Sequence, residues 1–137
     1  MRRVSPLLLL ATLTHCAGRL YSTSTASSIR APDDVYACLS EGLGKLGYRR
    51  THYDPGDRWY VAQKPDPSAR LADVRFRQQI NSVDFRVRPD ASGNSSVEIK
   101  VQSFNQFADQ KGFSEVEVTA SDQAKADAAR VATTCSQ

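Results

Sequence analysis

Few residues of this sequence have the chemistry of a catalytic or metal centre. There are only two histidines and three cysteines among 137 residues. No serine lies in the Gly-x-Ser-x-Gly pattern of a nucleophile elbow. His52 lies near Asp54 and Asp57, but this spacing matches no known set of metal ligands, and a solvated turn is the better interpretation. We therefore predict that the protein is not an enzyme and that it holds no metal or cofactor.

The sequence also lacks a large charge excess of either sign. It has 18 Lys and Arg residues against 15 Asp and Glu residues, and two of the arginines lie in an N-terminal segment that we expect to be removed. A nearly neutral chain argues against a nucleic-acid-binding protein, which needs a strongly basic surface. Internal repeats are missing too, so one small domain is expected after this segment.

No apolar run is long enough to span a membrane as an anchor, which takes roughly 20 residues. The longest run, residues 4–13, follows Arg2 and Arg3 and contains no charge. A short apolar run behind a basic start is typical of an export signal. Residues 1–15 are therefore predicted to be a signal peptide and are left out of the fold prediction.

The run ends in Leu13-Thr14-His15-Cys16, which resembles the lipobox of bacterial lipoproteins. Leu13, Thr14 and Cys16 match that motif, whereas His15 departs from it because a small residue is usual before the cysteine. The resemblance implies that Cys16 carries a lipid. An ordinary secretion signal with an incidental cysteine is the alternative. Residues 16–30, rich in Ser, Thr and Ala, are predicted to be a flexible tether behind the lipidated cysteine.

A lipid on Cys16 would leave Cys38 and Cys135 as the only other cysteines. An exported protein enters an oxidising compartment, in which disulfides form and persist. We therefore predict a disulfide between Cys38 and Cys135, near the two ends of the domain. Two buried free thiols are the alternative.

Two helices are predicted, one near each end of the domain. The first covers residues 31–48, because Pro32 suits a first helical turn, apolar residues recur at helical spacing, and Gly47 is placed to end it. The second covers residues 121–135, with Ser121 or Asp122 as its cap and small residues along one face.

Between the helices, apolar and charged residues alternate with the period of two that half-buried antiparallel strands show. Strands are predicted at residues 59–63, 72–80, 83–90, 96–104 and 115–119. A turn at Asn81-Ser82 would separate two of them. The predicted fold is a two-layer α+β domain over residues 31–137, with an N-terminal helix, a three- to five-stranded meander and a C-terminal helix, both helices on one sheet face.

The sequence around Asp34-Val35-Tyr36, the Leu-Gly-Tyr at residues 46–48 and the strand at residues 97–104 resembles small bacterial lipoproteins that contain a domain of unknown function. The resemblance implies a lipidated cysteine, a meander and a closing helix, and it carries over no catalytic residue. With Ala17 after the cysteine, it also implies a periplasm-facing position at the outer membrane.

Five basic residues are predicted to stand on the open face of the sheet: Arg75, Arg77, Arg86, Arg88 and Lys100. A solvated face with opposite charges paired across strands is one interpretation. The other is a binding surface for an anionic glycan, lipid head groups or an acidic patch of an envelope protein. The sequence thus predicts a lipid-anchored envelope protein with a binding or structural role. A free periplasmic binding domain is the alternative, and an envelope hydrolase is a weaker one.

Overall fold

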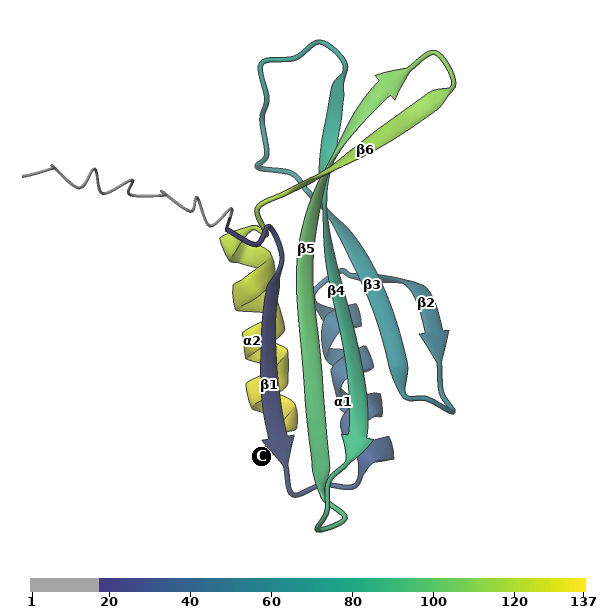
Figure 1. The fold of residues 1–137 in the computed structure, drawn as a ribbon, viewed down its shortest axis with the longest axis vertical. Helices are drawn as coiled ribbons and strands as arrows, with labels where there is room; N and C mark the ends of the chain where they lie inside the picture. Colours follow the sequence, from purple (N-terminus) through teal and green to yellow (C-terminus); the bar gives the residue numbers. More distant parts are fainter. Residues whose placement is uncertain (1–17) are drawn as a thin grey trace, which may run out of the picture.

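A computed structural model describes residues 18–137 of the chain. Its elements follow one another in the order β1 (Ser22–Ser28), α1 (Pro32–Lys45), β2 (Arg49–Asp54), β3 (Trp59–Asp66), β4 (Phe76–Pro89), β5 (Ser95–Asp109), β6 (Gly112–Val118) and α2 (Asp122–Cys135). Figure 1 shows the strands as one curved sheet with both helices behind it.

All strand pairs are antiparallel, and the order across the sheet is β1-β5-β4-β3-β2, with β6 also paired to β5. β4 occupies one edge of β5 along almost its whole length. On the other edge, Ser22 of β1 pairs with Val101, and Val118 of β6 pairs with Ser103. β1 and β6 therefore lie end to end along the same edge of β5.

The predicted fold class was wrong, because the described chain is dominated by a six-stranded sheet and begins with a strand rather than a helix. β1 lies inside residues 16–30, which were predicted to be a flexible tether. Its residues STSTASS show no apolar alternation. The reason is its position at an edge of the sheet, where only Ala26 packs against the core and most other side chains remain exposed.

The predicted turn at Asn81-Ser82 was also wrong, because both residues lie in the middle of the uninterrupted strand β4. Both side chains are buried. Asn81 faces Ser103 on β5, whose hydroxyl donates to Asn81 Oδ1 at 2.7 Å. Polar residues can occupy the middle of a buried strand when their hydrogen bonds are made in this way, and a sequence alone does not show the partner.

The helix ends follow the predictions. Gly47 adopts φ +87° after α1, and the next amide, Tyr48 N, donates to the carbonyl of Leu43. This left-handed residue closes the helix, which is the usual role of glycine there. At the start of α2 the hydroxyl of Ser121 accepts a hydrogen bond from Ala124 N at 3.1 Å, as a helix cap does.

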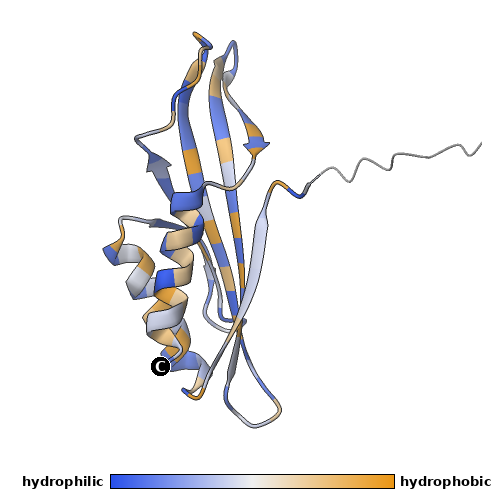
Figure 2. Ribbon diagram, turned by 90° about the vertical axis from the view of Figure 1, so that its left-hand side faces the viewer, coloured by the Kyte–Doolittle hydropathy of each residue, from blue (hydrophilic) through white to orange (hydrophobic). Residues whose placement is uncertain are grey.

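The core lies between the two helices and one face of the sheet. Figure 2 shows the alternation that produces it, with hydrophobic and hydrophilic residues following one another along the long strands. The buried apolar side chains that β4 and β5 contribute to the core cluster are Val83, Phe85, Val87, Val97, Ile99 and Val101. They pack against Val35, Leu39 and Leu43 of α1 and Ala124, Ala128 and Val131 of α2.

The predicted disulfide is confirmed. Cys38 of α1 and Cys135 of α2 are bonded, with their Cα atoms 5.7 Å apart and a sequence separation of 97. The bond therefore joins α1 directly to α2, the last element of the domain.

Gly42 and Gly44 differ only in what surrounds them on α1, and they provide a matched test of helix packing. A Cβ at Gly42 would lie 2.7 Å from Cγ1 of Val131, whereas one at Gly44 would meet nothing within 4 Å. Val131 is buried and β-branched, so it cannot rotate away easily. We expect Gly44→Ala to raise the free energy of unfolding by about 0.5–1 kcal/mol, and Gly42→Ala to lower it by about 1–3 kcal/mol. Urea unfolding of both variants measures this, and equal effects would show that α1 and α2 do not approach closely at Gly42.

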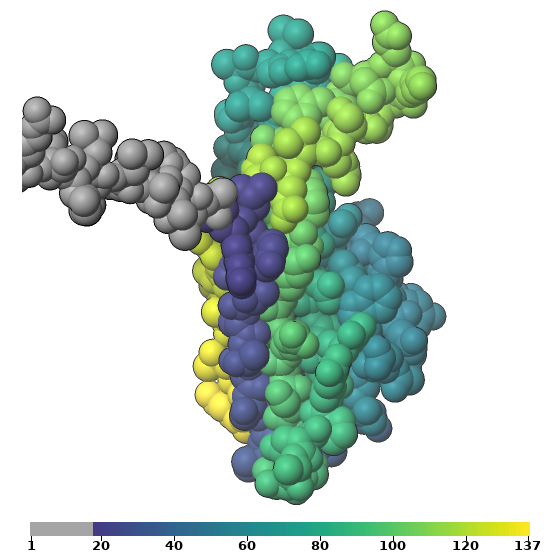
Figure 3. All heavy atoms as spheres, in the orientation of Figure 1, coloured from purple at the N-terminus to yellow at the C-terminus, as the bar shows by residue number. Residues whose placement is uncertain are grey.

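Beyond Ser22, the first residue of β1, the sheet continues without helices over it. We call this part the arm: the first residues of β4 (76–80), the second half of β5 (103–109), all of β6, and the loop of residues 67–75. In Figure 1 the arm rises above both helices. The space-filling view shows that it ends in two prongs, one made by the loop and one by the β5–β6 hairpin (Figure 3).

Candidate functional site

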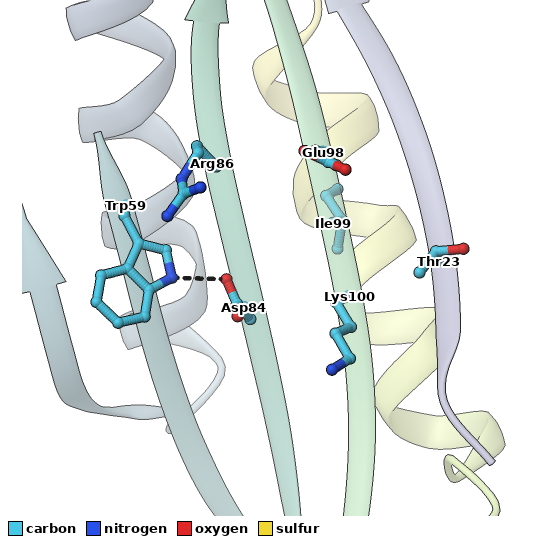
Figure 4. A pocket seen from close by; sticks show the side chains of 7 residues that line it. All are labelled: Thr23, Trp59, Asp84, Arg86, Glu98, Ile99 and Lys100. Carbon is cyan, nitrogen blue, oxygen red and sulfur yellow. Dashed lines mark hydrogen bonds between the residues drawn. The ribbon is translucent and has the colours of Figure 1, made fainter. Parts of the chain in front are cut away.

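The open face of the sheet, on the side away from the helices, carries a hollow of about 200 Å³. It lies across β3, β4, β5 and β1 (Figure 4). Its lining side chains are Thr23, Trp59, Asp84, Arg86, Glu98, Ile99 and Lys100. It combines an aromatic ring with charges of both signs, so we take it as the candidate site.

Strand register explains why these side chains meet. Trp59 pairs with Arg86, and Arg86 pairs with Glu98. In the adjacent row Asp84 pairs with Lys100. Residues directly opposite one another on antiparallel strands point to the same face. The charges therefore alternate in sign across the hollow.

Trp59 is fixed in place by its polar edge. Its indole N–H donates to Asp84 Oδ1 at 2.9 Å (Figure 4). The ring of His52 from β2 stacks on it, with 6.1 Å between ring centroids, and the guanidinium carbon of Arg86 lies 5.9 Å from the indole centroid. One carboxylate oxygen of Asp84 thus accepts the indole hydrogen bond, and Asp84 does not form an ion pair with Lys100.

Arg86 has donor capacity to spare. Its Nε lies 3.3 Å from Asp57 Oδ2, close enough for an ion pair. The N–H of Nε does not point at this oxygen well enough for a hydrogen bond. Among the buried side-chain nitrogens and oxygens of residues 18–137, Nε is the one without a hydrogen-bond partner. This ion pair contributes little to binding or stability, because Asp57 is 60% exposed and water screens its charge.

Lys100 is the second cation of the hollow. Its Nζ lies 4.7 Å from the ring centroid of Tyr21, which extends the aromatic lining toward β1. In residues 18–137 its ammonium group has no carboxylate within ion-pair distance, although Glu98 and Asp84 stand nearby in the sheet. The hollow therefore contains two cations that no carboxylate fully neutralises.

The five basic residues predicted for this face do not come together. Arg86 and Lys100 line the hollow. Arg88 lies two residues after Arg86, near the end of β4. Arg75 and Arg77 lie at the other end of β4, and the nine residues from Arg77 to Arg86 span roughly 30 Å of strand.

Arg75 and Arg77 are also held by local contacts within the arm. β4 begins only at Phe76, and a bulge follows between residues 76 and 78, so the alternation predicted from residue 72 onward is broken. Arg75 is bound to Asp73 at 2.9 Å, and this contact lowers the pKa of the Asp73 carboxyl. Arg77 folds back to donate to the carbonyl of Val74 at 3.0 Å.

The turn predicted around Asp54 and Asp57 is present, and His52 lies on the strand that leads into it. Asp54 Oδ1 accepts hydrogen bonds from the backbone amides of Gly56 and Asp57, which closes the turn. Among residues 18–137, no three His, Cys, Asp or Glu side chains come together as metal ligands. His52 instead serves as a stacking partner of Trp59.

The sequence did not predict the buried polar cluster around Asp127. Asp127 of α2 is almost fully buried and accepts hydrogen bonds from Tyr48, Lys64 and Gln123 at 3.2, 3.2 and 2.8 Å. Burial and the neighbouring carboxylate raise the pKa of the Tyr48 hydroxyl. The feature of the sequence that could have predicted this cluster is an acidic residue, Asp127, next to Ala128 on the apolar side of α2. Because every partner is satisfied, this cluster is structural.

The predicted signal peptide, residues 1–15, and the predicted lipidation site, Cys16, lie outside the described residues. Within residues 18–137, neither helix has the length and apolar content needed to cross a bilayer.

Comparison with known proteins adds little. The chain matches no family model and no curated protein. Among solved structures it is similar to one titled "Crystal structure of Ara h 8.0201", with a TM-score of 0.49 and 8% sequence identity, covering 84% of this chain and 90% of that one. This likeness is too weak to transfer a function.

Proposed function

We propose that the protein is an exported component of the cell envelope, anchored at a membrane by a lipid on Cys16, and that it acts by binding rather than by catalysis. The observation that carries the binding role is the hollow on the open sheet face. There Arg86 lies beside a fixed indole, Lys100 stands on the next strand but one from that indole, and neither cation is neutralised by a well-formed ion pair. The disulfide supports export, because such bonds persist in oxidising compartments.

The ligand that fits this hollow best is an anionic glycan. Arg86 and Lys100 can bind carboxylate or phosphate groups through charge-assisted hydrogen bonds. Glu98 and the free oxygen of Asp84 can accept hydrogen bonds from hydroxyl groups. A purely anionic partner would be repelled by these two acids, whereas a sugar polymer with both acidic groups and hydroxyls uses all four side chains.

Replacing both cations should weaken this binding strongly. We expect the double variant Arg86→Gln/Lys100→Gln to bind polygalacturonate at least roughly tenfold more weakly than the native chain, because each charged hydrogen bond contributes about 1.5–3 kcal/mol. Titration calorimetry at low and high salt measures the change, and native binding should weaken as salt rises.

The matched control is Arg75→Gln/Arg77→Gln, which removes the same charge far from the hollow. It should bind like the native chain. If both double variants lose binding equally, the interaction is a general charge effect and the hollow is not the site. If neither loses binding, the hollow plays no part in it.

The anchor is tested separately by the intact mass of the mature protein from a membrane fraction. The proposal requires a chain that begins at Cys16 and carries acyl groups. A soluble chain that begins beyond Cys16 would rule out the anchor and leave a free periplasmic binding domain.

A further inference from the structure

We infer that the outer edge of β1 is a docking site for an extended peptide segment of another protein, which adds to the sheet as a further strand. Neither the glycan hollow nor a lipid on Cys16 is needed for this contact. Three features of the molecule carry it: the unpaired backbone of β1, its lack of the groups that block other edge strands, and an uncharged groove beside the edge.

β1 is paired along one side only. Its seven residues face β5, from Ser22 opposite Val101 to Ser28 opposite Ser95, and within residues 18–137 no strand pairs with its other side. In an antiparallel pair, alternate residues direct both N–H and C=O away from the partner strand. Three or four of the seven residues therefore present a donor and an acceptor each along the outer edge. The chemical complement of such a row is the backbone of another extended chain, which binds by adding a strand.

Two other edge strands of the sheet carry features that block strand addition, and β1 carries none of them. β2, at the opposite edge, begins with Arg49 and Arg50, and its register shifts between Arg50 and His52. β6 carries Glu115 and Glu117. Charged side chains and bulges on an edge strand hinder pairing with another chain. The sequence of β1, STSTASS, contains no charge and no proline, and its register with β5 runs without a shift.

A groove of about 480 Å³ runs along this edge, between β1 and the C-terminal half of α2. Residues 24–27 of β1 form one side, and Ala129, Ala132 and Thr133 form much of the other. None of the residues that line it has a charged side chain. Figure 2 looks onto the side of the molecule where β1 and α2 meet. A strand added to β1 would therefore lie against α2 as well.

The groove also selects the chemistry of the segment that it binds. Side chains of an added strand point alternately to the open sheet face and to α2. Ala129 and Ala132 have short side chains, so small or β-branched apolar residues of the partner fit over them. A charged residue at these positions would lose water without gaining a countercharge. The partner segment is therefore extended and uncharged at every second position, and polar residues are accepted between.

The first test uses random peptides displayed on phage and selected on the native chain. We expect the enriched peptides to share uncharged residues at every second position. A synthetic copy of one should bind Ala129→Arg at least roughly tenfold more weakly than the native chain in titration calorimetry, because the new side chain fills the groove with bulk and charge. Ala129 is exposed, so this variant keeps its fold. Failure to enrich any peptide would overturn the inference.

Thr134→Arg is the matched control. Thr134 is an exposed residue of the same helix that does not line the groove, and its replacement adds the same side chain. This variant should bind the peptide like the native chain. Equal loss of binding in both variants would show that added charge on α2 weakens binding wherever it lies, and the groove would not be the site.

Amide hydrogen exchange followed by NMR tests for strand addition itself. In the free chain, the outward amides of Ser22–Ser28 face water and should exchange fast. A saturating concentration of the peptide should slow exchange at these alternate amides at least roughly tenfold. Unchanged exchange would show that the peptide contacts side chains alone, and strand addition would be ruled out.

Two further measurements separate this contact from its alternatives. Ala129→Arg should bind polygalacturonate like the native chain, so that loss of the peptide site and loss of the glycan site are told apart. Sedimentation of the native chain should show a monomer. A dimer that Ala129→Arg dissociates would show that a second copy occupies the edge of β1, and the proposal of a peptide partner would fall.

Discussion

Replacing Cys38 and Cys135 with alanine is expected to lower the free energy of unfolding by about 4–5 kcal/mol. The bond spans 97 residues, and closing a loop of that size removes much conformational entropy from the unfolded chain. A domain of this size has about 5–15 kcal/mol of stability in total. The double variant should therefore unfold at a much lower denaturant concentration, and a substantial part of it should be unfolded at 37 °C.

Urea unfolding followed by circular dichroism measures this effect. The native chain unfolded in dithiothreitol is the control, because it has lost the bond but keeps both sulfur atoms. Cys135 is fully buried, so any further loss in the alanine variant reports its packing and not the cross-link. A difference of less than 1 kcal/mol between oxidised and reduced native protein would contradict the prediction.

Removing the cation beside Asp127 is expected to have the second largest effect. Lys64→Met keeps most of the apolar stem but leaves a carboxylate that is 3% exposed without its countercharge. Breaking a buried pair in this way typically costs about 3–5 kcal/mol. Lys64 also donates to the carbonyl of Leu46 at 3.0 Å and lies 4.8 Å from the Tyr48 ring centroid, so several contacts are lost together.

An exposed ion pair on α1 supplies the control for this prediction. Lys45 and Glu41 lie 2.8 Å apart, but both side chains are more than two-thirds exposed. Lys45→Met should therefore change the free energy of unfolding by less than about 0.5 kcal/mol. Adding Asp127→Asn to Lys64→Met should recover part of the loss, because the buried charge is gone. Equal effects of the two lysine variants in urea unfolding would show that Asp127 is solvated.

The sequence predicted those elements whose signals are local. α1 and α2 were found because capping residues, helical periodicity and Gly47 act within a few residues of one another. The disulfide followed from the number of cysteines and the expected compartment. β1 was missed because its pairing to β5 depends on residues far along the chain, and its own Ser, Thr and Ala side chains match a linker equally well.

The same distinction applies to the site. Arg86 and Lys100 were recognised as outward-facing cations, because strand alternation is visible in the sequence. Their neighbour Trp59 was not connected with them, since its register against Arg86 is set by the pairing of β3 with β4. The register shift between Phe76 and Gln78, where Arg77 has no paired residue on β5, also depends on the partner strand.

The position of β1 also bears on how the chain folds. Among the elements of residues 18–137 β1 comes first, yet it pairs with the edge of β5, where Ser28 joins Ser95 and Ser22 joins Val101. Such non-local pairing gives a high contact order, and high contact order slows folding. Until β5 is available, the first strand has no partner, and until β1 arrives, half of one β5 edge stays unprotected. The period between these two events is when this domain is most open to wrong pairing with a second chain.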